Sequence, residues 1–145
     1  MAKEIQILLV EDNEGDIVLT MEALKEAKIH NKIDVVRDGE EALNFLLKKG
    51  RYTSSKTPDI IFLDINLPKL DGIELLVTLK KDQNLKAIPV IMLTTSDAEK
   101  DIKRAYYNHA NCYITKPVDI HSFIDVVHTI KSFWISTVQL PKSYN

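Results

Sequence analysis

Three carboxylates stand at the ends of two short apolar segments of this chain. Glu11 and Asp12 follow the segment Ile5–Val10, and Asp64 follows Ile60–Leu63. Carboxylates that meet raise each other's pKa or attract a cation, and Mg²⁺ suits them because it accepts one or two carboxylates together with water and a phosphate oxygen. Acids also occur at strand ends and helix starts without a ligand, an alternative that applies mainly to Glu11 and Asp12. Asp64 closes a strongly apolar run, where a carboxylate without a partner is costly.

A hydroxyl and an ammonium group stand at the ends of two further segments. Thr94, followed by Thr95, ends the apolar run that begins at Ile88, and Lys116 follows the short run 111–115. An ammonium can bind one phosphoryl oxygen while a hydroxyl donates to another. Taken singly, threonine is also frequent in strands and lysine is usually solvated. An acid pair, an acid, a hydroxyl and an ammonium in this order at four segment ends together indicate a site for a phosphoryl group.

The segments that end in these residues alternate with amphipathic stretches along the chain. Apolar runs rich in β-branched residues predict strands at Ile5–Val10, Lys32–Arg37, Asp59–Asp64, Ile88–Thr94 and Asn111–Thr115. Helical patterns lie between and after them, at residues 14–28, 38–49, 71–82, 97–108 and 119–135. Five successive βα units predict an α/β fold of the (βα)5 type, a parallel sheet sandwiched between two layers of helices.

The composition of the predicted strands indicates their order in the sheet. The first, third and fourth are almost entirely apolar, as central parallel strands must be, whereas the second alternates with charged residues and the fifth is short and polar. Right-handed crossovers then give the order 2-1-3-4-5, which is the flavodoxin-like order. Strands one and three become neighbours where the winding reverses, so we expect the site at their carboxyl ends.

Helix starts support these boundaries. Ser96 to Glu99 has the pattern of a capping box, and Asp38 and Asp71 each precede a glutamate by three residues. The stretch 97–108 has a thin apolar stripe, so we expect it to be the least firmly anchored helix. Pro117 either begins the last helix or follows a cis Lys116–Pro117 peptide bond, a form adopted by about 5% of such bonds.

Composition narrows the class of protein. The chain has 145 residues with 45% hydrophobic and 28% charged residues and a net charge of −2, which favours one globular domain spanning residues 1–145 and gives no basic patch for nucleic acid or an anionic membrane. The lone Cys112 cannot form an internal disulfide, and the sequence lacks a signal peptide and a long apolar span. We therefore expect a soluble cytoplasmic protein. About ten residues follow position 135, too few for an output domain.

These motifs together resemble the response-regulator receiver family over nearly the whole chain. The matching segments are Leu8–Asp12, Ile61–Pro68, Asp71–Gly72, Pro89–Thr94 and Tyr113–Pro117. The resemblance implies that Asp64 is the phosphoacceptor, that Asp12 binds Mg²⁺ directly and that Glu11 binds it through water. It further implies that the backbone carbonyl of Asn66 completes the metal site and that Lys116 pairs with the phosphoryl group. It also implies that Thr94, with Thr95, and Tyr113 are the residues of the conformational switch.

One departure from the family pattern occurs at His109, where most receivers have glycine. Histidine tolerates the left-handed backbone conformation better than most residues, so the turn is expected to survive. The segments His109–Tyr113, Ser132–Trp134 and Thr137–Pro141 resemble the small receivers that serve bacterial phytochromes. This resemblance implies a phytochrome-type sensor histidine kinase as the phosphoryl donor, and we expect Phe133 and Trp134 to close the core.

The expected function is a phosphorelay response regulator, not an enzyme that turns over an external substrate. The Asp64 carboxylate would attack a phosphohistidine of the kinase and form an acyl phosphate, with Mg²⁺ and Lys116 neutralising charge on the transferred group. The added charge would draw Thr94 inward, let Tyr113 turn and reposition the face formed by helix 97–108 and strand 111–115. Output would pass through protein contacts of this face, including self-association as a homodimer.

Three other classes share part of the pattern. A flavodoxin-type electron carrier needs a phosphate cradle after strand one, where this chain has the acidic run Glu11–Glu14. A haloacid-dehalogenase-type phosphatase places its nucleophilic aspartate on the first strand with a second acid two residues later, where this chain has Asn66. A pseudo-receiver that never takes phosphate is disfavoured because the acids, the hydroxyl and the lysine are all present.

Overall fold

The fold is a five-stranded parallel sheet between two layers of helices. The computed structural model describes residues 5–26, 32–135 and 137–141. The strands are β1 (Ile7–Val10), β2 (Ile33–Val36), β3 (Ile60–Leu63), β4 (Val90–Thr94) and β5 (Cys112–Thr115). They pair in the order β2-β1-β3-β4-β5, all parallel, which confirms the predicted flavodoxin-like fold.

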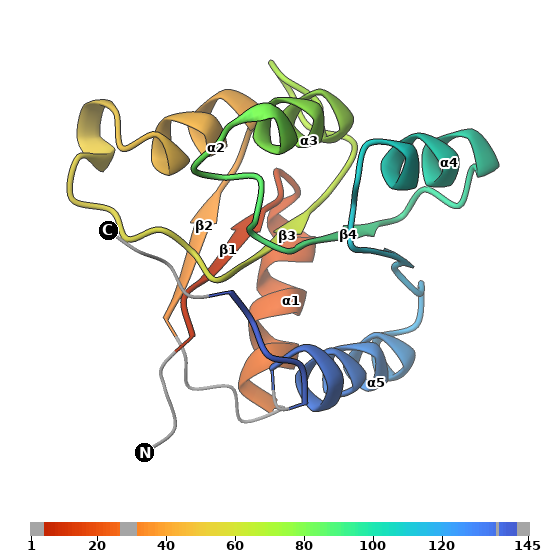
Figure 1. Ribbon diagram of the computed structural model, residues 1–145. Helices are drawn as coiled ribbons and strands as arrows, with labels where there is room; N and C mark the ends of the chain where they lie inside the picture. Colours follow the sequence, from red (N-terminus) through yellow and green to blue (C-terminus); the bar gives the residue numbers. More distant parts are fainter. Residues whose placement is uncertain (1–4, 27–31, 136, 142–145) are drawn as a thin grey trace.

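The helices cover both faces of this sheet, as Figure 1 shows. They are α1 (Glu14–Glu26), α2 (Gly39–Leu46), α3 (Gly72–Lys81), α4 (Glu99–Tyr107) and α5 (Ile120–Ile130). α1 and α5 lie side by side on one face, and α2, α3 and α4 lie on the other (Figure 1). α2, α3 and α4 are shorter than predicted at both ends, because the amphipathic pattern extends into the turns on either side, and α5 begins one residue later than predicted. Residues 27 and 28 of the first predicted helix lie outside the described ranges.

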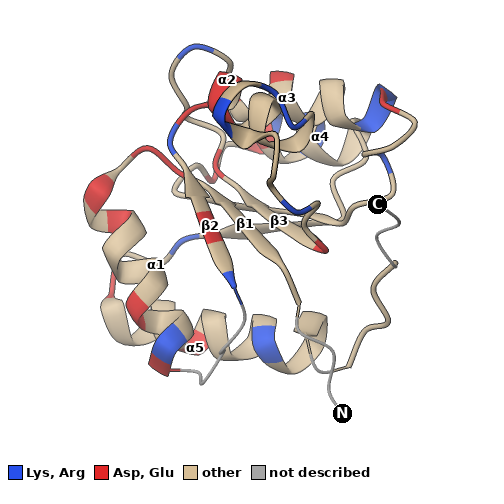
Figure 2. Cartoon of the chain, turned by 90° about the vertical axis from the view of Figure 1, so that its left-hand side faces the viewer, with Lys and Arg blue, Asp and Glu red and all other residues tan. Residues whose placement is uncertain are grey.

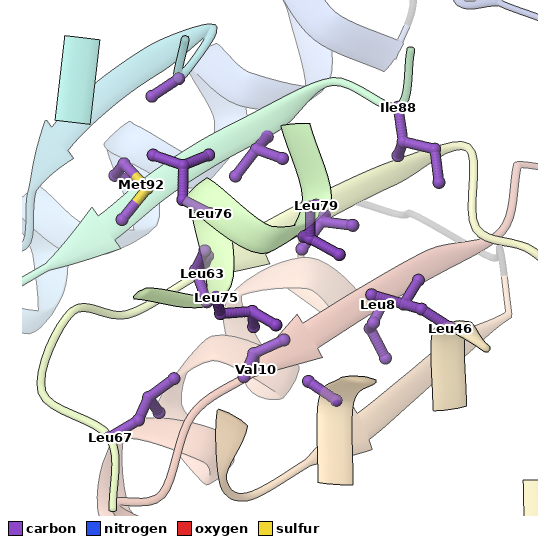
Figure 3. Packing of buried hydrophobic residues seen from close by; sticks show 14 of the residues in the cluster. Leu8, Val10, Leu46, Leu63, Leu67, Leu75, Leu76, Leu79, Ile88 and Met92 are labelled. Atoms are coloured by element: carbon purple, nitrogen blue, oxygen red, sulfur yellow. The ribbon is translucent and has the colours of Figure 1, made fainter. Parts of the chain in front are cut away.

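Alternate residues of the central strands supply two hydrophobic clusters, one on each face. Leu8 and Val10 of β1 pack with α2 and α3, while Ile7 and Leu9 pack with α1 and α5. Figure 3 shows the first cluster, in which Leu75, Leu76 and Leu79 of α3 lie over the sheet. α4 contributes a single buried residue, Ala105, which agrees with its predicted weak anchoring.

The edge strands differ from the central ones in burial, as their composition predicts. All residues of β1, β3 and β4 are buried, whereas most of β2 is partly exposed and β5 is partly exposed up to its exposed last residue, Thr115. Figure 2 shows an acidic residue on β2. The bounds of β2 identify this residue as Asp34, whereas β1 and β3 have no charged residue in their sequences. The site at the carboxyl ends therefore rests on the most deeply buried strands of the sheet.

Helix capping agrees with the sequence at two of the three predicted positions. Asp71 and Glu74 form a full capping box at α3, and Asp38 accepts the Glu41 N–H at α2. The box predicted at Ser96 is wrong, because α4 begins three residues later, at Glu99, after Ala98, which offers no side-chain cap. The Ser96 hydroxyl instead donates to Asp101 Oδ2 at 2.6 Å and accepts the Ala98 N–H.

The end of the last helix changes its geometry. A π-helical turn, η2 (Lys131–Ile135), continues α5 to the predicted boundary. The wider turn rotates successive side chains, so Trp134 and Ile135 pack on the α1/α5 cluster whereas Phe133 is 53% exposed. The expectation that Phe133 closes the core is therefore wrong.

Two further predictions concern the backbone around β5. His109 has φ 72°, the left-handed conformation expected at this glycine-like position. Peptide bonds in the described ranges are all trans, so the cis form considered for Lys116–Pro117 is wrong. The trans form of an X–Pro bond is favoured by about 0.5–1 kcal/mol, and Pro117 adopts it in the loop before α5. Across residues 5–26, 32–135 and 137–141, no helix is long and apolar enough to cross a membrane.

Candidate functional site

The ends of β1 and β3 bring three acids together. Val10 pairs with Leu63 in the sheet, so Glu11 and Asp64 occupy the next positions on neighbouring strands. Carboxylate oxygens of Glu11, Asp12 and Asp64 all lie within 4.8 Å of one another. The cluster expected from the strand order is therefore present, and hard oxygen donors at this spacing can share one divalent cation.

Burial divides the three acids into two kinds. Glu11 is 1% exposed and Asp64 is 7% exposed, whereas Asp12 is open to solvent. The Glu11 N–H donates to Val36 O and the Asp64 N–H donates to Val10 O, which holds both residues in the sheet. Asp64 Oδ1 also accepts the Ile65 N–H at 2.7 Å, so the orientation of this carboxylate is set by the loop that follows it.

The surroundings of Glu11 disfavour its charged form. Burial, followed by the neighbouring Asp64 carboxyl, raises the pKa of Glu11 to about 9, although the Lys116 ammonium opposes the shift. Its Oε2 is buried and has no hydrogen-bond partner among the residues that the structure describes. A buried, unpartnered carboxylate oxygen beside two more acids is what a hard divalent cation would satisfy, so these residues fit Mg²⁺.

Lys116 enters the site from β5. Its N–H donates to Thr94 O at 2.7 Å, which continues the β4–β5 ladder by one residue. The side chain is buried, with Nζ 2.7 Å from Glu11 Oε1 and 3.4 Å from Asp16 Oδ2. The ammonium thus reaches the acidic cluster as predicted, but it is paired with Glu11 and Asp16.

Thr94 and Tyr113 converge on the backbone of Ser96. Thr94 is fully buried and its Oγ1 accepts the Ser96 N–H at 3.4 Å, while the Tyr113 hydroxyl donates to Ser96 O at 2.8 Å. Burial raises the pKa of the Tyr113 phenol, which keeps it a hydrogen-bond donor. Thr95, the residue between Thr94 and Ser96, is exposed. The loop after β4 therefore connects the hydroxyl and the aromatic ring.

Two residues of the site escaped the sequence reasoning. Asp16 lies four residues after Asp12, in the first turn of α1, and only this closeness in sequence could have suggested it. Gly72 matched the family pattern without a stated role; its N–H donates to Ile65 O, and a Cβ there would lie 2.0 Å from Asp64 O. Gly72 thus lets α3 approach the end of β3 closely. Asn66, whose carbonyl is expected to join the metal site, lies on this loop with an exposed side chain.

Cation binding should depend on pH. A group with a raised pKa of about 9 holds its proton at neutral pH, and a bound cation favours its charged form, so binding must release that proton. We expect the Mg²⁺ affinity to rise by up to about tenfold per pH unit below pH 9 and then level off. Calorimetric titrations in two buffers of different ionisation enthalpy count the protons released. Glu11→Gln should flatten this dependence, and an equally steep profile in that variant would contradict the assignment.

The comparisons with known proteins agree with this geometry. Residues 7–128 match the response regulator receiver domain family. The response regulator Rcp1 of Synechocystis sp. (strain ATCC 27184 / PCC 6803 / Kazusa) is 45% identical over 93% of this chain and 92% of its own length. The probable methanogenesis regulatory protein FilR2 of Methanothrix harundinacea is 40% identical over 93% of this chain and 86% of its own.

Two crystal structures superpose closely on the fold. The phosphorylated cyanobacterial phytochrome response regulator RcpA has a TM-score of 0.92 and 45% identity, covering 97% of this chain and 100% of its own. The Mn²⁺-bound form of Rcp1 has a TM-score of 0.90 and 44% identity, covering 95% and 99%. The acidic cluster at the β1 and β3 ends, the matched sequence family and these structures lead to one conclusion: the chain belongs to the family of response-regulator receiver domains.

Proposed function

We propose that this chain is a phosphorelay response regulator that accepts a phosphoryl group from a sensor histidine kinase onto Asp64. The observation that carries the proposal is the acidic cluster itself, with a buried Asp64 beside Glu11 and Asp12 and an ammonium group within the same site. A buried carboxylate at the end of a central strand is difficult to explain by stability alone. The match of residues 7–128 to the receiver domain family supports the same class of function.

The chemistry assigns a separate task to each group. A carboxylate oxygen of Asp64 attacks the phosphorus of a phosphohistidine, the P–N bond breaks, and the histidine imidazole leaves with its electron pair. Asp12, Glu11, Asp64 and the Asn66 carbonyl would hold Mg²⁺, which neutralises charge on the transferred group when bound. The Ile65 N–H holds the Asp64 carboxylate in orientation, and Lys116 supplies a cation to a phosphoryl oxygen.

The switch follows from the two bonds that meet at Ser96. A phosphoryl group on Asp64 adds charge of about −1.5 to −2, which needs hydroxyl and N–H donors. Thr94 turns toward it and leaves the Ser96 N–H, while Tyr113 leaves Ser96 O and fills the vacated space. The Tyr106 hydroxyl accepts the Tyr113 N–H, so the movement is passed to α4.

The surface read by partners is the face formed by α4 and β5. Tyr106 is 49% exposed and Tyr107 is 84% exposed on it, and α4 is weakly anchored. Aromatic residues at such exposure are typical of protein contacts. We propose that residues 1–145 form a single receiver domain, which acts through this face on a second protein or as a homodimer.

The phosphoryl donor that we propose is a phytochrome-type histidine kinase. The support is the 45% sequence identity of this chain to Rcp1 and to RcpA, of which RcpA is a cyanobacterial phytochrome response regulator. The sequence segments His109–Tyr113, Ser132–Trp134 and Thr137–Pro141 resemble the same group, and the first of them leads into β5 of the α4/β5 face.

A phosphotransfer assay tests the proposal. A bacterial phytochrome kinase carrying radiolabelled phosphohistidine is mixed with this protein, and we expect the label to move to the smaller chain with Mg²⁺ and to stay on the kinase with EDTA. Transfer from other histidine kinases alone would reject the phytochrome donor. Label that stays on every kinase tested, with no modification by acetyl phosphate either, would reject the phosphorelay function.

A further inference from the structure

The ammonium of Lys116 is held by two acids, neither of which is Asp64. Its Nζ lies 2.7 Å from Glu11 Oε1 and 3.4 Å from Asp16 Oδ2. Within the described part of the chain these are the acids within 4.0 Å of that nitrogen. An ammonium has three donors, and two of them are engaged before any phosphoryl group arrives.

The two contacts of the ammonium differ in how easily they can be broken. The Glu11 side chain is 1% exposed, so its buried carboxyl group could not replace the contact with water if Lys116 left. The Asp16 side chain is 33% exposed and its contact is the longer one, so this carboxylate can be rehydrated at little cost. A movement of Lys116 toward Asp64 would therefore break the contact with Asp16 first.

The position of Asp16 is set by α1 and not by the lysine. The Asp16 N–H donates to Asn13 Oδ1 at 2.9 Å, which fixes the first turn of the helix. Asp16 therefore presents its carboxylate to the ammonium from a helix that packs along α5. The pair joins the start of α1 to the residue after β5.

We propose that Asp16 is a positioning residue that holds Lys116 away from Asp64 until phosphorylation, and so lowers the affinity of the site for a phosphoryl group. The inference rests on the proposed function and names a residue that regulates it. Because the Asp16 contact must be given up when Lys116 binds the phosphoryl oxygens, its free energy is subtracted from phosphoryl binding. The strength of the Asp16–Lys116 contact therefore sets how readily the protein leaves its unphosphorylated state.

An alternative explanation is that any negative charge at the start of α1 weakens phosphoryl binding, without a specific contact to Lys116. Glu14 lies in the same first turn, but its exposed side chain pairs with Arg37. If the helix dipole or general repulsion were responsible, Glu14→Gln would act like Asp16→Asn. If the contact with Lys116 is responsible, only the change at Asp16 matters.

The test is a titration with beryllium trifluoride, a phosphoryl mimic, at saturating Mg²⁺. We expect Asp16→Asn to tighten binding roughly threefold, as for a partly exposed ion pair, while Glu14→Gln and the charge-conserving Asp16→Glu stay near wild type. Unchanged or weaker binding by Asp16→Asn would overturn the proposal. A wild-type protein that does not bind the mimic would overturn the proposed function instead.

A double-mutant cycle distinguishes the positioning of Lys116 by Asp16 from direct repulsion between Asp16 and the phosphoryl mimic. In a Lys116→Met background, Asp16→Asn should no longer change the affinity for the mimic, and a gain that persists would overturn the proposal. The same cycle measured by urea unfolding in EDTA needs neither metal nor mimic. There we expect the two changes to be coupled by roughly threefold in the unfolding equilibrium constant, and additive effects would show that the contact carries no energy.

Discussion

Replacing Asp64 with asparagine is expected to reduce phosphoryl incorporation from acetyl phosphate to background, while the wild-type protein takes up one group per chain. The asparagine amide has nearly the same shape but lacks the anionic oxygen that must attack phosphorus. Its place at the end of β3 and its N–H bond to Val10 O do not depend on the charge, so the fold should persist. Intact-mass spectrometry after incubation with Mg²⁺ measures the incorporation directly.

Asp59 offers a matched control at the opposite end of the same strand. It is 7% exposed, like Asp64, and its Oδ2 accepts the Gln6 N–H away from the acidic cluster. Asp59→Asn should still take up one phosphoryl group. Incorporation that persists in Asp64→Asn, with peptide mapping to another residue, would contradict the assignment of the phosphoacceptor.

Replacing Gly72 with alanine is expected to lower the free energy of unfolding by about 3 kcal/mol, a large loss for a single methyl group. The added Cβ would lie 2.0 Å from Asp64 O and 2.7 Å from Ile65 Cα. Both contacts are with backbone, so a change of rotamer cannot relieve them, and α3 must move away from β3. Urea unfolding measures the loss, and we expect phosphoryl uptake to fall with it because the Asp64 loop is displaced.

Gly50 provides the control for this substitution. Its φ is +60°, yet a Cβ added there would meet no atom within 4 Å, so Gly50→Ala carries only the backbone cost of about 1 kcal/mol. Equal losses at the two positions would mean that the close approach of α3 to Asp64 does not constrain the fold.

The order of the strands and the place of the site could be read from the sequence because both depend on local pattern. Apolar continuity distinguishes buried from edge strands, and parallel strands joined by right-handed crossovers leave few arrangements. Once β1 and β3 are neighbours, Glu11, Asp12 and Asp64 must meet. The caps at Asp38 and Asp71 were predictable for the same reason, since a cap involves residues three positions apart.

Ser96 shows where local pattern fails. Its spacing to Glu99 suits a capping box, but its carbonyl is bound by Tyr113, seventeen residues along the chain, and its hydroxyl by Asp101. These contacts hold residues 96–98 outside the helix. Phe133 fails similarly, because the π-helical turn rotates it away from a core that Trp134 and Ile135 then cover.

The sequence by itself thus determined the sheet, its edges and which residues reach the carboxyl rim, because period and chain connectivity decide these. Only the tertiary structure decided that Lys116 binds Glu11 and Asp16, that Gly72 touches the Asp64 backbone and that Thr94 and Tyr113 share Ser96. When a side chain can reach several neighbours, distance and burial decide which of them it binds. Those quantities exist only once elements far apart in the chain have packed together.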